Sequence, residues 1–314
     1  MLSEVAVIPR SGFINRIQAI ASAAILARQT GARLRVCWFP CAYVTTPAED
    51  VFTEAWCTEF VVNESWVRQT YGAGVDDLPL YVSWNEREGF IGLRGHDVGE
   101  QALMDAFWTD VTDHQPAPRV LVIAGGTFFI PQPGREEAAV HADFLAAKRD
   151  FYRELPLSHE IESLAKAARD ADSTPYLGLH LRYTDRSHEA PTRRQIRRAI
   201  ARVAADTGLK RVFIASDSSA ERDYWTREAE ILGLVPWVFD ASEVSGATAA
   251  MVDWRLLGEA ERLVYFTASS YAVEAVVASG SWETSIGLGA APLRSLAVRT
   301  SVLAQAGWRR LTHA

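Results

Sequence analysis

Histidine and arginine stand two positions apart at the end of an apolar run, an arrangement that could bind a phosphate-containing ligand. Residues 176–181 read as a buried strand that contains His180, and Arg182 follows directly. Open α/β sheets bind ligands at the carboxyl ends of their strands. An arginine at such an end presents a fork of hydrogen-bond donors and stays charged at any relevant pH. The alternative is that Arg182 pairs on the surface with Asp185.

A second segment ends an apolar strand with an acid. Asp217 follows the run 211–215, and its carboxylate suits the adjacent N1–H and exocyclic amine of guanine. Alternatively, Asp217 or Ser218 caps the helix that follows.

A third segment passes from a strand into a helix through Ser269, Ser270 and Tyr271. Backbone N–H groups at a helix N-terminus, together with two hydroxyls, form an anion site. Ordinary capping by serine is the other interpretation.

Hydrophobic periodicity supplies the elements that must position these segments. Residues 5–8 and 34–39 read as strands around a helix over 14–30, a βαβ unit that implies a parallel sheet. Residues 63–118 are rich in tryptophan and show few clean periods; most of the ten tryptophans are expected to fill the core. Further strands are expected at 119–124, 176–181, 211–215, 235–239 and 262–267, and helices at 136–153, from 158, and at 193–207, 219–232, 249–259 and 272–278.

This rhythm predicts an α/β protein with two Rossmann-like domains facing a cleft. The boundary is expected near residues 155–158, which gives one domain over 1–156 and a second over 157–314. The last helix could cross back to the first domain.

The composition excludes several function classes. A net charge of −7 argues against nucleic acid or an anionic membrane as a partner. The start of the chain lacks the pattern of a signal peptide, and no window approaches the roughly 18 apolar residues of a membrane span. Three cysteines without a C-x-x-C pair (Cys37, Cys41 and Cys57) indicate a reduced, cytoplasmic chain.

The three segments together resemble the fucosyltransferase superfamily that includes the α-1,6-fucosyltransferases, the bacterial nodulation enzymes and the protein O-fucosyltransferases. The similar motifs are H-x-R at His180-Leu-Arg182, a strand end at Ala215-Ser-Asp217, a D-x-x-x-L helix from Asp253 to Leu257, and the serine pair 269–270. The resemblance covers residues 145–280, and less specifically the turn 11–16 and the stretch 38–52.

This resemblance implies a GT-B fold with GDP-fucose bound mainly by the C-terminal half. Arg182 would hold the β-phosphate, and His180 and Asp217 would contact the guanosine. Ser269, Ser270 and the backbone of Tyr271 would complete the diphosphate site. The family inverts the anomeric centre without a metal, and we expect no metal site because no D-x-D motif stands at a strand end.

The first half contributes a turn with Gly12 and Asn15. In the O-fucosyltransferase branch an asparagine of a glycine-containing turn lies near the donor, and Asn15 resembles it. Capping of the following helix by Asn15 is the alternative.

The resemblance also suggests a base for the acceptor hydroxyl. In the α-1,6 branch a lysine and then a glutamate follow the arginine motif, and Arg186 and Glu189 resemble them if one residue of the loop is missing. Asp185 and His188 are reserve candidates.

One departure concerns the donor. The α-1,6 branch has a second arginine where this chain has Tyr183. Either Arg16, Arg193 or Arg194 supplies the charge, or the donor is another nucleotide sugar. The sequence thus predicts a bacterial glycosyltransferase acting on a saccharide or small natural product, with a non-catalytic nucleotide-sugar-binding protein as the other alternative.

Overall fold

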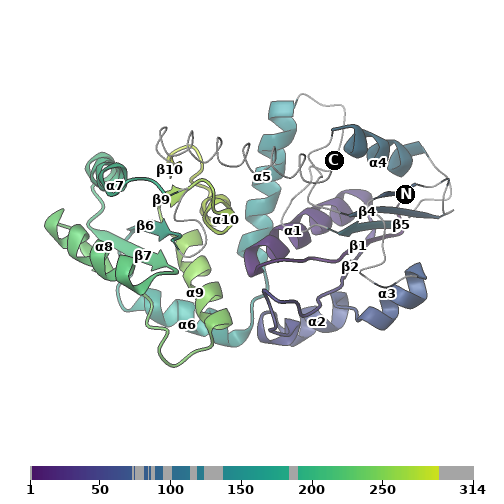
Figure 1. The fold of residues 1–314 in the computed structure, drawn as a ribbon, viewed down its shortest axis with the longest axis horizontal. Helices are drawn as coiled ribbons and strands as arrows, with labels where there is room; N and C mark the ends of the chain where they lie inside the picture. The colour runs from purple at the N-terminus through teal and green to yellow at the C-terminus, as the bar shows by residue number, and fades with distance from the viewer. Residues whose placement is uncertain are drawn as a thin grey trace, which may run out of the picture. The chain divides into compact units, whose positions relative to one another are not determined.

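The computed structural model describes residues 2–72, 74, 81–83, 85, 89–94, 101–113, 119–123, 137–183 and 190–289. They form two compact units (Figure 1). The first comprises the residues up to Ala167 together with Ala241–Val252, and the second comprises Ala168–Asp240 together with the residues from Asp253 on.

The first unit is built on a five-stranded sheet of order β2-β1-β5-β4-β3. All neighbouring strands are parallel except β3, which runs antiparallel to β4. The chain leaves β1 on one side toward β2, while β5 pairs on the other side. The carboxyl end of β1 therefore lies at a topological switch point, the usual place for a ligand in such sheets. The strands are β1 (Glu4–Val7), β2 (Arg33–Val36), β3 (Tyr81–Val82), β4 (Phe90–Arg94) and β5 (Arg119–Ile123).

The helices of this unit match the expected periodicity over residues 14–30 and differ from the expectation over residues 63–118. The expected helix over 14–30 is α1, which ends at Gly31 in the left-handed conformation that glycine favours. The stretch 63–118, expected to be irregular, contains two helices and two strands in its described part, so that expectation was wrong. The helices are α1 (Phe13–Thr30), η1 (Ala48–Asp50), α2 (Glu54–Phe60), α3 (Glu64–Tyr71), α4 (Gln101–Asp113) and α5 (Glu137–Glu154). Helix α6 (His159–Asp170) spans the boundary to the second unit.

The second unit is a parallel five-stranded sheet of order β10-β9-β6-β7-β8. The chain runs outward from β6 to β8 and then returns to β9 on the other side of β6. This reversal places a second switch point between β6 and β9. The elements are β6 (Tyr176–Leu181), α7 (Arg193–Thr207), β7 (Arg211–Ser216), α8 (Ser219–Ile231), β8 (Val235–Trp237), β9 (Arg262–Phe266), α10 (Ser270–Ser279) and β10 (Ile286–Leu288). Helix α9 (Gly246–Gly258) spans the boundary and belongs to this unit from Asp253 on.

The two faces of β6 carry different side chains because strand residues alternate in direction. Leu177, Leu179 and Leu181 pack with residues of α7 and α8 in one buried cluster. On the other face, Tyr176 donates its hydroxyl to the carbonyl of Leu256 in α9 at 2.7 Å. Right-handed crossovers place the α7/α8 pair and the α9/α10 pair on opposite faces of the sheet.

Gly178 lies on the α9 face, where little room is left between strand and helix. A Cβ atom there would stand 3.1 Å from the Cβ of Ala260 and 3.2 Å from Cδ2 of Leu257. Glycine therefore lets the end of α9 pack directly on β6, next to the position of His180. In the part of the chain that the structure describes, no helix has both the length and the apolar character to span a membrane.

Candidate functional site

The β6–β9 switch point brings His180 and the start of α10 together. The imidazole of His180 stacks on the ring of Tyr271, with centroids 5.0 Å apart and planes 26° apart. His180 is 6% exposed. It lies on the α9/α10 face of β6 because its even position opposes the leucines of the other face.

His180 is held as a neutral imidazole. Burial lowers its pKa to about 3, with the charge of Arg182 acting in the same direction and that of Asp217 against it. Its Nδ1 is buried and has no hydrogen-bond partner among the described residues. A buried polar atom without a partner is costly, so this nitrogen fits a polar group of a ligand.

Arg182 follows β6 and lies near the same two rings. Its positive charge lowers the pKa of Tyr271 and of His180, while burial is the larger effect on both groups. The guanidinium and the start of α10 therefore act on one region of the second unit.

Tyr183 points the other way. Its ring meets that of Phe266 at 5.6 Å, edge to face, and packs against the α7/α8 cluster. The side chain at position 183 thus covers the core, which explains an aromatic residue where the resembling family has an arginine.

Asp217 links the ends of two strands. Its Oδ1 accepts a hydrogen bond of 2.8 Å from the backbone N–H of Tyr183. The N-cap of α8 is Ser218, whose hydroxyl accepts from the N–H of Glu221. Asp217 is therefore not the cap, and its exposed carboxylate stands at the edge of the site.

The start of α10 provides a helix N-terminus at the switch point. Ser269 is the N-cap residue, but its side chain makes no capping hydrogen bond. Its hydroxyl is buried and has no hydrogen-bond partner in the described part of the chain, and the first turn of α10 has no acidic residue. An uncapped helix start with a buried hydroxyl is suited to an anion. Ser270 and Tyr271 begin the helix itself.

Asp253 belongs to the same region, although we assigned it no role from the sequence. Burial raises its pKa to about 7, with the charge of Arg222 opposing this, and its own charge raises the pKa of Tyr271. A lone acid between Val252 and Trp254, both buried, was the available signal. A carboxyl group with a strongly shifted pKa beside a switch point is a candidate binding group.

Gly12 and Asn15 lie in the first unit, where the chain leaves β1 and enters α1. Gly12 is the N-cap residue. Asn15 is the third residue of the helix, which excludes the alternative that it caps α1. Its Nδ2 donates to Oγ of Ser11 at 3.1 Å. The structure thus places both residues at the carboxyl edge of their own sheet.

The remaining predicted residues have different outcomes. Glu189 and Arg186, with the reserve candidates Asp185 and His188, lie outside the described residues. Arg193 is paired with Glu221 at 2.8 Å and lies over the ring of Tyr224 at 3.7 Å.

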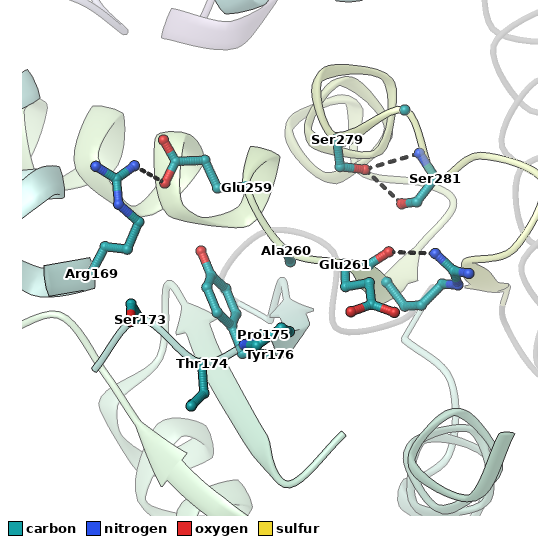
Figure 2. Close-up of a pocket in the computed structure, with 12 residues that line it drawn as sticks. Arg169, Ser173, Thr174, Pro175, Tyr176, Glu259, Ala260, Glu261, Ser279 and Ser281 are labelled. Carbon is teal, nitrogen blue, oxygen red and sulfur yellow. Dashed lines mark hydrogen bonds and ion pairs between the residues drawn. The ribbon is translucent and has the colours of Figure 1, made fainter. Parts of the chain in front are cut away.

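The second unit also forms a pocket at the opposite end of its sheet, where β6 and β9 begin (Figure 2). Its volume is about 510 Å³. An ion pair of 2.6 Å joins Arg169 to Glu259 on one side, and Ser279 and Ser281 line the other (Figure 2). This pocket is separate from the His180 region because the two lie at opposite ends of β6.

Comparison with known proteins identifies the architecture. No protein-family model matches the sequence, and no curated protein matches it by sequence. Among solved structures, FUT1 of Arabidopsis thaliana, a mutant in complex with GDP, matches with a TM-score of 0.60 at 15% identity over 89% of this chain and 69% of that one. Fucosyltransferase NodZ from Bradyrhizobium matches with a TM-score of 0.54 at 18% identity over 88% and 93%. POFUT1 in complex with GDP-fucose gives 0.51 at 13% identity over 90% and 96%.

The chain therefore has a two-unit α/β fold of the GT-B class. It is the fold of the fucosyltransferases named above, as the sequence motifs predicted.

Proposed function

We propose that the protein is a glycosyltransferase that transfers a sugar from a nucleoside diphosphate, specifically L-fucose from GDP-fucose, to a hydroxyl group. The acceptor is a saccharide or a small natural product. The proposal is supported by two observations: the charge of Arg182, at the end of β6, acts on Tyr271 in the first turn of α10, and the N-cap residue of that helix, Ser269, makes no side-chain capping bond. The fold shared with NodZ and with POFUT1, whose structure contains GDP-fucose, supports the choice of donor.

The reaction needs a site that stabilises a departing diphosphate. When the bond between sugar and β-phosphate breaks, negative charge grows on the phosphate oxygens. Arg182 and the amides at the start of α10 offer fixed positive charge at that point, and such preorganised groups typically contribute several kcal/mol. Because these groups can neutralise the leaving group, the reaction as proposed requires no metal.

We propose that the neighbouring side chains recognise the guanine base. Neutral His180 can donate or accept one hydrogen bond through Nδ1. Asp217 accepts a hydrogen bond from the backbone N–H of Tyr183, and its exposed carboxylate is proposed to contact the guanosine. We add Asp253 as a second carboxylate that can accept from the paired donors of guanine.

Glu189 is proposed as the base that removes the proton of the acceptor hydroxyl, assisted by Arg186. Attack from the face opposite the diphosphate would invert the anomeric centre. Glu189→Gln should therefore leave donor binding intact and lower transfer by about 100-fold or more, the range of general-base catalysis. Transfer at an unchanged rate would remove Glu189 from this role.

The second candidate function is transfer from a nucleotide sugar other than GDP-fucose. It is motivated by Tyr183, which stands where the α-1,6 branch has an arginine. Melting temperatures in the presence of GDP, UDP and ADP separate the two, because a ligand that binds the folded state stabilises it. The proposal expects stabilisation by GDP and GDP-fucose. Stabilisation by UDP or ADP but not by GDP would show that the donor is a UDP- or ADP-sugar and not GDP-fucose.

Transfer itself is tested with GDP-fucose and a panel of saccharide acceptors, by release of GDP with and without EDTA. We expect acceptor-dependent release that EDTA does not change. Binding of GDP-fucose with no transfer to any acceptor would favour a non-catalytic binding protein.

A further inference from the structure

Arg16 of α1 is a buried cation that pairs with no carboxylate among the residues that the structure describes. It is 0% exposed. Its Nε donates to the carbonyl of Ser11 at 3.1 Å, and its guanidinium lies 4.7 Å from the centre of the Trp38 ring. Within the described part of the chain, Nη1 has no hydrogen-bond partner, and none of the groups that act on the charge of Arg16 is a carboxylate.

Such a charge needs a counter-ion. Arginine does not give up its proton in proteins, so it cannot escape burial by becoming neutral. An isolated buried charge is strongly unfavourable. Burial lowers the pKa of Arg16, and the nearby charge of Arg10 adds to the effect. An anion beside Arg16 would relieve both effects.

Cys41 is the group in contact with Arg16 that can become an anion. Its Sγ accepts a hydrogen bond of 3.1 Å from Nη2 of Arg16. The backbone amides of Tyr43 and Val44 also donate toward it. These donors and the charge of Arg16 hold the pKa of the Cys41 thiol below its usual value, although burial acts to raise it.

The other two cysteines provide a built-in comparison. Cys37 and Cys57 are buried, whereas Cys41 is partly exposed. Burial raises the pKa of Cys57 to about 11, and the pKa of Cys37 rises further. Since the thiolate is the reactive form, reactivity should concentrate at Cys41.

We propose that Cys41 is a thiolate paired with buried Arg16 and a covalent modification site for low-molecular-weight disulfides. The Cys41 thiolate attacks one sulfur of the disulfide, the new S–S bond forms as the old one breaks, and the other half leaves as a thiolate. The exchange involves no net oxidation or reduction, because one disulfide and one thiolate are present before and after it. An added thiol reverses it. This inference does not depend on the proposed transferase activity.

Modification would act on the turn between β1 and α1. The mixed disulfide removes the negative charge beside Arg16, which also holds the carbonyl of Ser11. Ser11 adopts a left-handed conformation with φ of 74°, a strained state for a residue other than glycine. We expect the loss of the anion to destabilise this turn, which contains Gly12.

The first test measures alkylation of the folded protein by limiting iodoacetamide, with each cysteine followed by mass spectrometry. Cys41 should react at least about tenfold faster than Cys37 and Cys57, with a pH midpoint below that of the same cysteine in denaturant. Arg16→Gln should slow the alkylation of Cys41 and raise the pH midpoint of that reaction. Arg68→Gln, which removes an exposed arginine paired with Glu64, is the charge-matched control. Equal rates at the three cysteines, or no effect of Arg16→Gln, would overturn the proposal.

Because Arg16→Gln could fail to fold, a second pair of variants tests the same charge. Cys41→Ser removes the anion and should lower the melting temperature, whereas Cys41→Asp restores an anion and should recover most of the loss. Oxidised glutathione should add to Cys41 and lower the melting temperature until dithiothreitol removes it. A Cys41→Ser protein as stable as the wild type, with Cys41→Asp less stable, would contradict an ionic pair.

Discussion

His180 and Tyr271 stack their rings across the β6–β9 switch point, with centroids 5.0 Å apart. The contact joins the carboxyl end of a buried strand to the first turn of α10, two residues after the uncapped Ser269. It holds a neutral imidazole and a helix N-terminus in one place, within reach of the charge of Arg182.

The hydroxyl of Ser269 should matter to the ligand and not to the fold. Ser269→Ala removes a buried, unpartnered oxygen, so the melting temperature should stay constant or rise slightly. The affinity for GDP should fall about fivefold to tenfold, the value of one hydrogen bond. Ser218→Ala is the converse control, because it removes the cap of α8 and should cost about 1 kcal/mol of stability while GDP binding stays unchanged. Identical effects in the two variants would contradict the assignment.

The stack itself is tested at Tyr271. Tyr271→Phe keeps the aromatic face and should bind GDP as the wild type does, while Tyr271→Leu loses about 0.5–1.5 kcal/mol of ring interaction and releases His180. We expect Tyr271→Leu to weaken GDP binding and to raise the pKa of His180, measured by NMR of the imidazole. An unchanged pKa of His180 in Tyr271→Leu would show that the ring does not shield it.

Asp253 should make stability depend on pH. Its folded-state pKa is raised to about 7, so between about pH 4 and pH 7 the folded protein binds a proton that the unfolded chain releases. Stability should therefore fall as pH rises through this window, by no more than about 1.4 kcal/mol per unit, with the protonated form favoured below it. Asp253→Asn should remove this slope in urea titrations. The same slope in both proteins would assign it to another group.

Ligand binding should show the opposite dependence. If ionised Asp253 accepts the paired N–H donors of guanine, affinity should rise as pH increases through 7. Guanosine is the appropriate ligand because it carries no phosphate that titrates near neutrality. An affinity of guanosine that is independent of pH from 6 to 8 would argue that Asp253 does not contact the base.

Close packing at Gly178 sets the position of β6 against α9. Gly178→Ala introduces a Cβ 3.1 to 3.3 Å from three side-chain carbons, and overpacking of this kind typically costs about 1–3 kcal/mol. Gly246→Ala meets no atom within 4 Å and is the matched control. Denaturant midpoints should separate the two variants, and equal midpoints would show that the strand shifts freely.

The strongly periodic elements could be predicted from the sequence. The bounds of β6 and α7 agree with the expected ranges, since an apolar run marks the strand and Thr192 begins a capping box ahead of the helix. The elements of 63–118 and strand β10 were not expected. Short elements with few periods carry little local signal, and tertiary pairing decides them.

The sequence predicted the site residues that directly follow strands. It missed the residues whose position depends on packing between distant parts of the chain. Order along the chain placed Arg182 and Ser269 at carboxyl ends of strands, and the parallel sheet brings such ends to one edge. The burial of Asp253 and the contact between Arg16 and Cys41, 25 positions apart, come from packing that no local pattern encodes. In the sequence, Tyr183 marked the absence of the second arginine of the α-1,6 branch. In the structure, its side chain continues the core face of β6 past the end of the strand.

The most direct test compares GDP with guanosine in the wild type and in Arg182→Ala, by isothermal titration calorimetry. We predict that Arg182→Ala weakens the binding of GDP about 10- to 100-fold, as expected for the loss of charge-assisted hydrogen bonds, and leaves the affinity for guanosine unchanged. An Arg182→Ala protein that is folded and binds GDP as tightly as the wild type would contradict the placement of the diphosphate at this switch point.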